Sequence, residues 1–236
     1  IAAFKAVSSD KISYINLLSS RAAPEQLGAA NYTRYLESAI NVLKIPCLSY
    51  AHYALMEDGT IKDGYFENLE LIRAAGLRHR TPFWSMIMAT GCMDYAEPTE
   101  AGLRFQVYSS LAYGTRGLSW FTYFTPSTGN FRMGPIDPFG AKTATWDILR
   151  RVNLQIHRLG PVFLQLKSIN VFHYPKAPRG GQDMTAGKYL TELNGGEFVV
   201  GEFVGPRERP FVMIVNKSLN RSARLSARFK PTGIIK

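Results

Sequence analysis

The apolar positions that follow residue 81 predict a strand, a helix and a second strand. Residues 82–88 form an apolar run, too short for a typical helix and bounded by proline and by Thr90-Gly91, which favours a buried parallel strand. After a polar loop, Thr99 can cap a helix. Apolar residues recur four positions apart on one face of this helix, at Leu103, Val107 and Leu111. Residues 118–124 then form another, aromatic strand.

The same alternation of strands and helices occurs upstream. Residues 12–18 and 47–50 have the apolar character of strands. Between them, residues 32–43 carry apolar side chains at the i, i+3, i+4 and i+7 spacing of a helix that packs on a core. Two further helices are indicated by the stripes Tyr65, Leu69 and Ile72, and Leu149, Val152, Ile156 and Leu159.

Four strand–helix units therefore follow one another and end near Lys167. An eight-stranded α/β barrel typically needs about 250 residues. We therefore expect residues 1–167 to be the C-terminal half of a (β/α)8 TIM barrel. Residues 1–7 resemble the end of a helix, so we expect the N-terminal half of the same protein to precede them. The alternative is a complete, open four-stranded α/β domain.

The pattern changes after residue 167 to short β-like runs separated by turns rich in glycine and proline. These runs are residues 169–174, 198–203 and 211–215. They predict a small antiparallel β domain over residues 168–236, with the character of a β-sandwich. Residues 175–187 are rich in glycine, proline and polar side chains, so we expect a mobile loop there.

The composition is that of an ordinary folded protein, with 46% hydrophobic and 12% aromatic residues. No apolar run approaches the ~20 residues of a membrane span, so no membrane partner is expected. The net charge of +10 is uneven, because residues 201–236 hold eight Lys or Arg against Glu202 and Glu208. No nucleic-acid-binding motif accompanies these charges. We expect a solvated basic face and no nucleic acid partner; an anionic polymer is the alternative.

The sequence gives no sign of a metal or cofactor site. Cys47 and Cys92 are too few for a disulfide framework, and we expect two buried free thiols. The histidines are widely scattered, at positions 52, 79, 157 and 173. Motifs for nucleotide binding, zinc proteases and serine hydrolases do not occur in the sequence. We therefore expect no metal and no cofactor.

If the barrel prediction holds, function lies where the strands end and the βα loops converge. Aromatic residues gather at these ends, where their faces can hold the C–H-rich face of a sugar while nearby polar groups bind its hydroxyls. Core packing is the alternative, assigned to Trp84 and Phe121 and left open for two of the candidates, Trp120 and Tyr123. The candidate saccharide-binding residues are Asn16, His52, Tyr53, Trp120 and Tyr123.

Several segments of the chain resemble a known group of enzymes. The segments "PFW" and "PTEAGLRFQVYSSLAYGTRGLSWFTYFTP" are similar to the seventh strand, the helix and the eighth strand of barrel glycoside hydrolases of clan A. The likeness is greatest to the β-galactosidase-like family 42 and its uncharacterised relatives. The segments "YINLLSSRAAPEQLG", "CLSYAHYAL" and "GYFENLELIRAAGLRHR" resemble strands five and six and the sixth helix of those relatives.

The resemblance implies hydrolysis of a glycosidic bond by two carboxylates about 5 to 5.5 Å apart. In clan A the acid/base follows strand four, which would precede residue 1, and the nucleophile follows strand seven. In this chain residues 88–91 occupy the position of the nucleophile, and they read Met-Ala-Thr-Gly, without a carboxylate. Asp94 is the nearest substitute. Less favoured carboxylates, which are more typical of solvated or helix-capping positions, are Glu57, Asp58 and Glu97.

His52 is the second catalytic candidate, because an imidazole at the rim can bind a sugar hydroxyl or carry a proton near neutral pH. A structural histidine is the alternative. Beside it, Ala51 stands where the resembled relatives are expected to carry an acidic residue, so this position is either a natural loss or an engineered change. The substrate class, an oligo- or polysaccharide, favours a secreted or periplasmic location.

Three hypotheses about function follow from the sequence. The first is a glycoside hydrolase-like protein that acts on a saccharide glycosidic bond. The second is a carbohydrate-binding pseudoenzyme that lacks the strand-seven nucleophile. The third is an interaction scaffold whose basic C-terminal strands bind an anionic polymer, with a steep dependence on salt.

Overall fold

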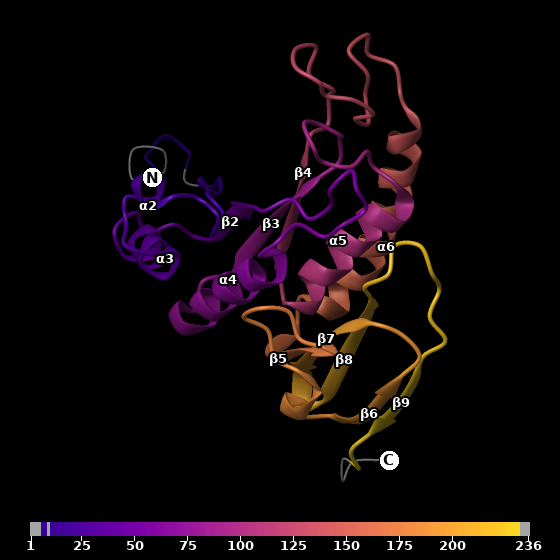
Figure 1. The fold of residues 1–236 in the computed structure, drawn as a ribbon. Coiled ribbons are helices and arrows are strands. Elements are labelled where there is room, and N and C mark those ends of the chain that lie inside the picture. The colour runs from indigo at the N-terminus through magenta and orange to yellow at the C-terminus, as the bar shows by residue number, and fades with distance from the viewer. Residues whose placement is uncertain (1–5, 9, 232–236) are drawn as a thin grey trace.

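The protein has a mixed α/β fold with a parallel and an antiparallel part (Figure 1). The structure is a computed structural model that describes residues 6–8 and 10–231. Its parallel sheet has the strands β1 (Asn16–Leu17), β2 (Leu48–Ala51), β3 (Phe83–Met88) and β4 (Gly117–Phe121). The strands lie side by side in chain order, each paired with the next. The expected α/β class is confirmed.

A helical segment separates each strand of this sheet from the next. The helices are α2 (Pro24–Leu27), α3 (Tyr32–Asn41), α4 (Tyr65–His79), α5 (Glu100–Ala112) and α6 (Ala144–Phe163). Short polar side chains cap the N-termini of several helices, because they accept hydrogen bonds from free backbone N–H groups of the first turn. The Asn31 side chain accepts from Arg34 N at 3.0 Å, and Thr99 Oγ1, the expected cap, accepts from Gly102 N at 3.0 Å.

Side chains of the parallel strands point alternately to two faces of the sheet. The outer face packs under the helices and carries Leu17, Leu48, Tyr50, Phe83 and Ile87, all buried in the hydrophobic cores. The register places the alternate positions on the opposite, inner face: Asn16, Ser49, Ala51, Trp84, Met86, Met88, Gly117, Ser119 and Phe121. Most of these inner side chains are exposed or half-buried in the described structure, with Ser49 and Met88 as buried exceptions. One face of the sheet is therefore covered and the other largely open.

The antiparallel part consists of two sheets that share a core. The larger sheet has β5 (Lys167–Tyr174), β7 (Phe198–Val204) and β8 (Pro210–Asn216), and the smaller has β6 (Leu190–Asn194) and β9 (Ser226–Phe229). Two short 3-10 turns, η1 (Met184–Ala186) and η2 (Pro206–Glu208), connect strands. The shared core contains Phe172, Leu190, Leu193, Phe198 and Val200.

One buried carboxylate fixes a turn of the antiparallel part. Glu202 on β7 is fully buried, and it accepts hydrogen bonds from Lys188 N at 2.8 Å and from Tyr189 N at 2.6 Å. Asn170 Nδ2 donates a further bond to it at 2.8 Å. Burying a charge is costly unless hydrogen bonds compensate it. The three donors meet that requirement, so Glu202 has a structural role.

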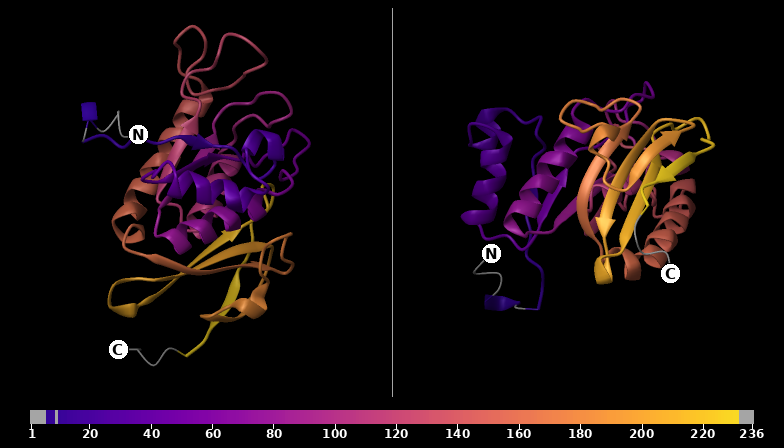
Figure 2. Two further views of the ribbon diagram at one scale, coloured as in Figure 1. Left: turned by 90° about the vertical axis from the view of Figure 1, so that its left-hand side faces the viewer. Right: turned by 90° about the horizontal axis from the view of Figure 1, so that it is seen from below.

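The two parts meet where β7 and β8 pack against α5 and where β5 contacts α4 through Ser168 and His173. Both views of Figure 2 show the antiparallel strands lying along these helices. At Gly201 the approach is so close that an added Cβ would lie 2.1 Å from Ala112 O. Beside it, Tyr113 Oη and His173 Nε2 form a buried hydrogen bond of 2.8 Å, and Phe66 packs edge-on to the imidazole.

The structure modifies several expected boundaries. The first and fourth strands are shorter than expected, because Asn16–Leu17 and Gly117–Phe121 alone pair with neighbours. The last helix, expected over residues 145–159, continues to Phe163 despite Pro161 inside it. Strands β6 and β9 were not predicted. The expected helix at residues 1–7 lies mostly outside the described residues, and only Ala6 and Val7 are seen as helical.

Helix lengths in the described structure also bear on the membrane prediction. None of the helices within residues 6–8 and 10–231 is both long and apolar enough to cross a membrane.

Replacing Gly201 by Ala tests the close contact between β7 and α5. The new methyl group would overlap the backbone of Ala112, and overpacking of this kind typically costs about 1–3 kcal/mol. We expect the loss of unfolding free energy to reach at least the upper part of that range, measured by denaturant unfolding. Gly160→Ala is the matched control, because a Cβ there meets nothing within 4 Å and alanine favours a helix by up to about 1 kcal/mol. Similar losses in both variants would contradict the packing argument.

The buried His173 predicts a loss of stability in acid. Burial lowers the pKa of His173 from 6.5 to about 3, and the positive charge of Lys217 acts in the same direction. Below pH 6.5 His173 is therefore protonated in the unfolded chain but stays neutral in the folded chain. The free energy of unfolding then decreases as the pH falls from about 6.5 towards 3. His173→Gln keeps a polar partner for Tyr113 but does not titrate. As the pH falls, we expect the unfolding free energy of His173→Gln to decrease less steeply than that of the unaltered protein, by up to about 1.4 kcal/mol per pH unit. Identical pH profiles would exclude this role of His173.

Candidate functional site

The carboxyl end of the inner face carries the best candidate site. Asn16 and Tyr53 both approach the Met86 sulfur, with Asn16 Nδ2 and Tyr53 Oη each 3.7 Å from it. Ser49 Oγ donates to Asn16 Oδ1 at 3.0 Å, which fixes the amide. Asn16 on β1 and Tyr53 in the loop after β2 therefore meet at the side chain of Met86 on β3. Two of the five predicted saccharide-binding residues, Asn16 and Tyr53, lie here.

Aromatic rings extend this group along the rim. Tyr53 stacks on Phe121 with centroids 5.6 Å apart, and Tyr95 meets Tyr53 edge-on at 5.5 Å. Phe131, from the loop after β4, contacts Phe121 at 6.1 Å. All four rings are half-buried, so each keeps part of its surface open to a ligand. Burial raises the pKa of Tyr53, so its hydroxyl is a neutral hydrogen-bonding group.

A hairpin made by residues 54–62 supports one side of the rim. Leu55 pairs with Ile61, and Lys62 N donates to Ala54 O at 2.7 Å. The hairpin pairs in turn with the loop after β3, through Met56 and Tyr95. At its base, Lys62 Nζ donates to Tyr95 Oη at 2.7 Å and lies 4.4 Å from the centre of the ring.

An ion cluster ties three rim loops together. Arg132, from the loop after β4, pairs with Glu97 at 2.9 Å and also with Glu57 on the hairpin. Its backbone pairs with Gly91, and Thr90 Oγ1 donates to Arg132 O at 2.9 Å. Glu57 and Glu97 are therefore counter-ions of one guanidinium group. This arrangement favours a structural role for both carboxylates.

Asp94 lies in the loop after β3, beside Tyr95. It is exposed, and its backbone carbonyl accepts from Glu57 N at 2.9 Å. In the described part of the chain its carboxylate forms no ion pair, in contrast to Glu57 and Glu97. Asp58 instead holds the hairpin turn, since it accepts from Thr60 N and Thr60 Oγ1, which lowers its pKa. Asp94 is thus the rim carboxylate most open to a ligand.

His52 lies beneath the rim, between the end of β2 and the start of α4. The ring is 7% exposed and meets Tyr65 edge-on. Among the described residues neither ring nitrogen has a well-aligned hydrogen-bond partner, and Asn68 Nδ2 is also unpaired, although the Asn68 amide lies near the ring. Burial lowers the pKa of His52, and the charges of Lys62 and Arg21 act in the same direction. His52 is therefore a buried neutral group, separated from open solvent.

The last two predicted residues lie on the other side of β4. Trp120 alternates with the inner-facing Ser119 and Phe121, and its Nε1 donates to Asn153 on α6 at 3.2 Å. Tyr123 is 59% exposed and contacts Trp146 on α6, edge to face at 5.8 Å. The structure therefore does not bring Trp120 and Tyr123 together with Asn16 and Tyr53.

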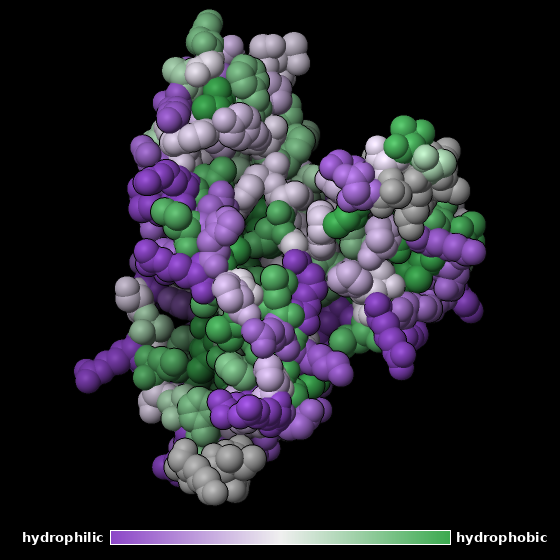
Figure 3. Space-filling model, turned by 180° about the vertical axis from the view of Figure 1, so that it is seen from behind, coloured by the Kyte–Doolittle hydropathy of each residue, from purple (hydrophilic) through white to green (hydrophobic). Residues whose placement is uncertain are grey.

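Among the described residues, four cavities of about 520 to 890 Å³ lie away from the inner rim. One of about 530 Å³ lies between β4 and α6, beside Trp120, Asn153 and His157. Another, of about 890 Å³, lies between α5 and the segment after β8, beside Tyr108 and Arg221. The inner rim is instead an open surface. Figure 3 shows a notch at the upper edge of the molecule, between the tall part with the rim loops and the lobe that carries the N-terminal helices.

The expectations about metals and cysteines can be compared with the described residues. Cys47 and Cys92 are both buried and free, as expected. No group of three or more His, Cys, Asp or Glu side chains within residues 6–8 and 10–231 is arranged to hold a metal ion.

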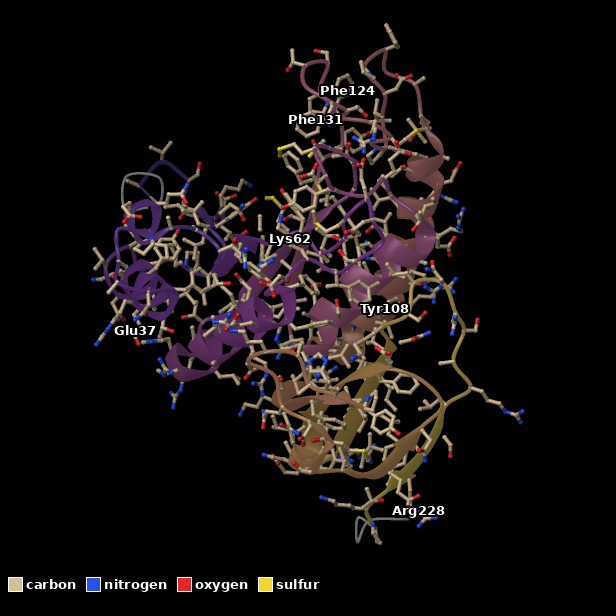
Figure 4. All side chains as sticks on the ribbon, in the orientation of Figure 1. Glu37, Lys62, Tyr108, Phe124, Phe131 and Arg228 are labelled. Carbon is tan, nitrogen blue, oxygen red and sulfur yellow. The ribbon has the colours of Figure 1, made fainter. Side chains whose placement is uncertain are left out.

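Sequence reasoning missed four contributors to the rim: Lys62, Met86, Phe121 and Phe131. Met86 and Phe121 were treated as part of an apolar wall, although the alternation of strand residues could have placed them on the inner face. Lys62 and Phe131 reach the rim through loop conformations that leave no periodic signal. Figure 4 labels Lys62 and Phe131, with Phe131 above Lys62 in the region of the rim loops.

Comparisons with known proteins do not assign the chain to a group. No protein family matches the sequence, and no curated protein is similar enough to count as a relative. The resemblance to glycoside hydrolases therefore rests on the segments quoted above.

Proposed function

We propose that this protein binds a saccharide at the inner rim of its parallel sheet, as a glycoside hydrolase-like protein. The observation that carries the proposal is the group formed by Asn16 and Tyr53 around Met86, with Phe121 stacked on Tyr53, on adjacent parallel strands and the loop after β2. Ligands of α/β proteins bind outside this end of the strands. Half-buried aromatic rings beside an amide and a phenol match the C–H faces and hydroxyls of a sugar.

The proposal includes completion of the sheet into a (β/α)8 barrel by the N-terminal half of the same protein. All-parallel sheets occur almost only with both faces covered or as closed barrels. Here the outer face is packed under helices while the inner face keeps Trp84, Met86 and Phe121 half-buried. The Trp84 ring also lies so close to Gly117 that a Cβ there would be 2.6 Å from it. A closed barrel would cover the inner wall and leave the rim as the accessible surface.

Hydrolysis is the second candidate function, and Asp94 is the observation that favours it. Its carboxylate is exposed beside the aromatic rim, whereas Glu57 and Glu97 are held by Arg132. Residues 88–91 supply no carboxylate. Binding without turnover, the pseudoenzyme hypothesis, therefore has more support than hydrolysis. His52 fits a positioning role better than proton transfer, because its ring nitrogens are buried.

Substitutions on the two sides of β4 test where a saccharide binds. We expect Tyr53→Ala and Asn16→Ala each to weaken binding of neutral oligosaccharides at least tenfold, or about 1.4 kcal/mol, by calorimetry on the full-length protein. Tyr123→Ala is the matched control, since this exposed tyrosine lies beside α6. Thermal unfolding of each variant separates lost binding from lost folding. A loss of affinity in Tyr123→Ala alone would move the site to the outer side of β4.

Removing the Asp94 carboxylate tests hydrolysis. If the full-length protein hydrolyses aryl glycosides, we expect Asp94→Asn to reduce kcat at least about 100-fold, the lower range for a general acid or base. Asp58→Asn is the control, because Asp58 only caps the hairpin turn. Turnover that survives in Asp94→Asn would exclude this residue. Saccharide binding without turnover in the unaltered protein would establish the pseudoenzyme.

A further inference from the structure

Lys62 is a cation of the inner rim that no carboxylate within residues 6–8 and 10–231 compensates. The nearby guanidinium groups are both neutralised, Arg132 by two glutamates and Arg21 by Asp63 at 2.8 Å. Lys62, in contrast, forms no ion pair in the part of the chain that the structure describes, and its polar partner there is the hydroxyl of Tyr95. Asp94 lies next to Tyr95 in sequence, and within the described residues it forms no ion pair with Lys62, which bonds to the Tyr95 hydroxyl. Lys62 as a residue is half-buried, and a charge near a protein surface is screened less than one in bulk water.

The position of Lys62 is fixed before any ligand arrives. Its N–H and C=O are both used, since Lys62 N donates to Ala54 O at 2.7 Å and Tyr65 N donates to Lys62 O at 3.2 Å. The hairpin that carries it is paired with the loop of Tyr95. A group held in its binding position loses little conformational entropy when a ligand binds.

Lys62 and Tyr95 together offer two hydrogen-bond donors to one ligand group. An ammonium group has three N–H donors, and Tyr95 Oη accepts one of them. The Tyr95 hydroxyl then keeps its own proton to donate. Two donors beside one positive charge match the two oxygens of a carboxylate. A carboxylate would also be held more firmly than a neutral group, because charge-assisted hydrogen bonds are about twice as strong as neutral ones. Tyr53, 5.5 Å from Tyr95, lies where the ring of the same ligand would stack.

We propose that the saccharide bound at the inner rim is acidic: a uronate whose carboxylate pairs with Lys62 and Tyr95 while its ring lies on Tyr53. This inference rests on the proposed function and names its substrate class.

Calorimetry with matched acidic and neutral ligands tests the inference. The probes are an oligogalacturonate and an oligoglucuronate, each beside its methyl ester, which keeps the sugar and removes the charge. We expect at least one acid to bind the full-length protein at least tenfold more tightly than its ester. Lys62→Met keeps the aliphatic stem on Tyr95, and we expect it to abolish this preference, so that acid and ester bind with similar affinity. Tyr95→Phe is expected to reduce the preference in part.

Lys188→Met is the matched control for overall charge, because Lys188 is exposed on the antiparallel part and its side chain is remote from the rim. It is expected to keep the full preference for the acid. Equal binding of acid and ester, or a preference that survives in Lys62→Met, would overturn the inference and leave saccharide binding intact. Failure of the unaltered protein to bind any acid, ester or neutral oligosaccharide would instead overturn the proposed function.

Discussion

The alternation of side chains along the parallel strands is the constraint on which the structure depends. Positions such as Leu48, Phe83 and Ile87 bury their side chains under the helices and supply the apolar contacts that hold the sheet. Their neighbours in sequence must then point to the other face. Because strand pairing is in register, these neighbours form rows across the inner face, and Asn16, Met86 and Phe121 belong to three successive rows that lead towards the carboxyl edge. The same alternation thus places the apolar side chains in the core and the residues of the candidate site on the opposite face.

The antiparallel part packs closely against the helical layer. Gly201 lets β7 approach the backbone of Ala112, and Tyr113 continues from that helix to the buried His173. A neutral imidazole hydrogen-bonded to a phenol satisfies two polar groups inside an apolar interface, which would be costly unpaired. Since α5 directly follows the loop of Tyr95, the contact that fixes the end of this helix also helps to fix the rim at its beginning.

The sequence predicts the parallel strands and their helices well because their signal is local. Thr99 and the stripe Leu103, Val107 and Leu111 specify α5 without reference to the rest of the chain. The short first strand and strands β6 and β9 were less predictable, since pairing partners far apart in sequence define them. The candidate site was partly predictable for the same reason. Asn16 and Tyr53 follow from strand ends, whereas Trp120 shows that residues at one strand end can face opposite sides.

The charges at the rim show how loops without periodicity acquire a defined chemistry. Arg132 draws Glu57 and Glu97 from two other loops, which holds these loops together but also removes both carboxylates as free groups. The same hairpin that presents Glu57 presents Lys62, and here the partner is a tyrosine hydroxyl instead of a carboxylate. In the described structure the aromatic rim therefore keeps two charged groups outside the Arg132 cluster: Lys62, which contacts Tyr95, and the exposed Asp94, which precedes Tyr95 in the loop. An asymmetric pair of charges around stacked rings can orient a polar ligand, because reversal would bring like charges together.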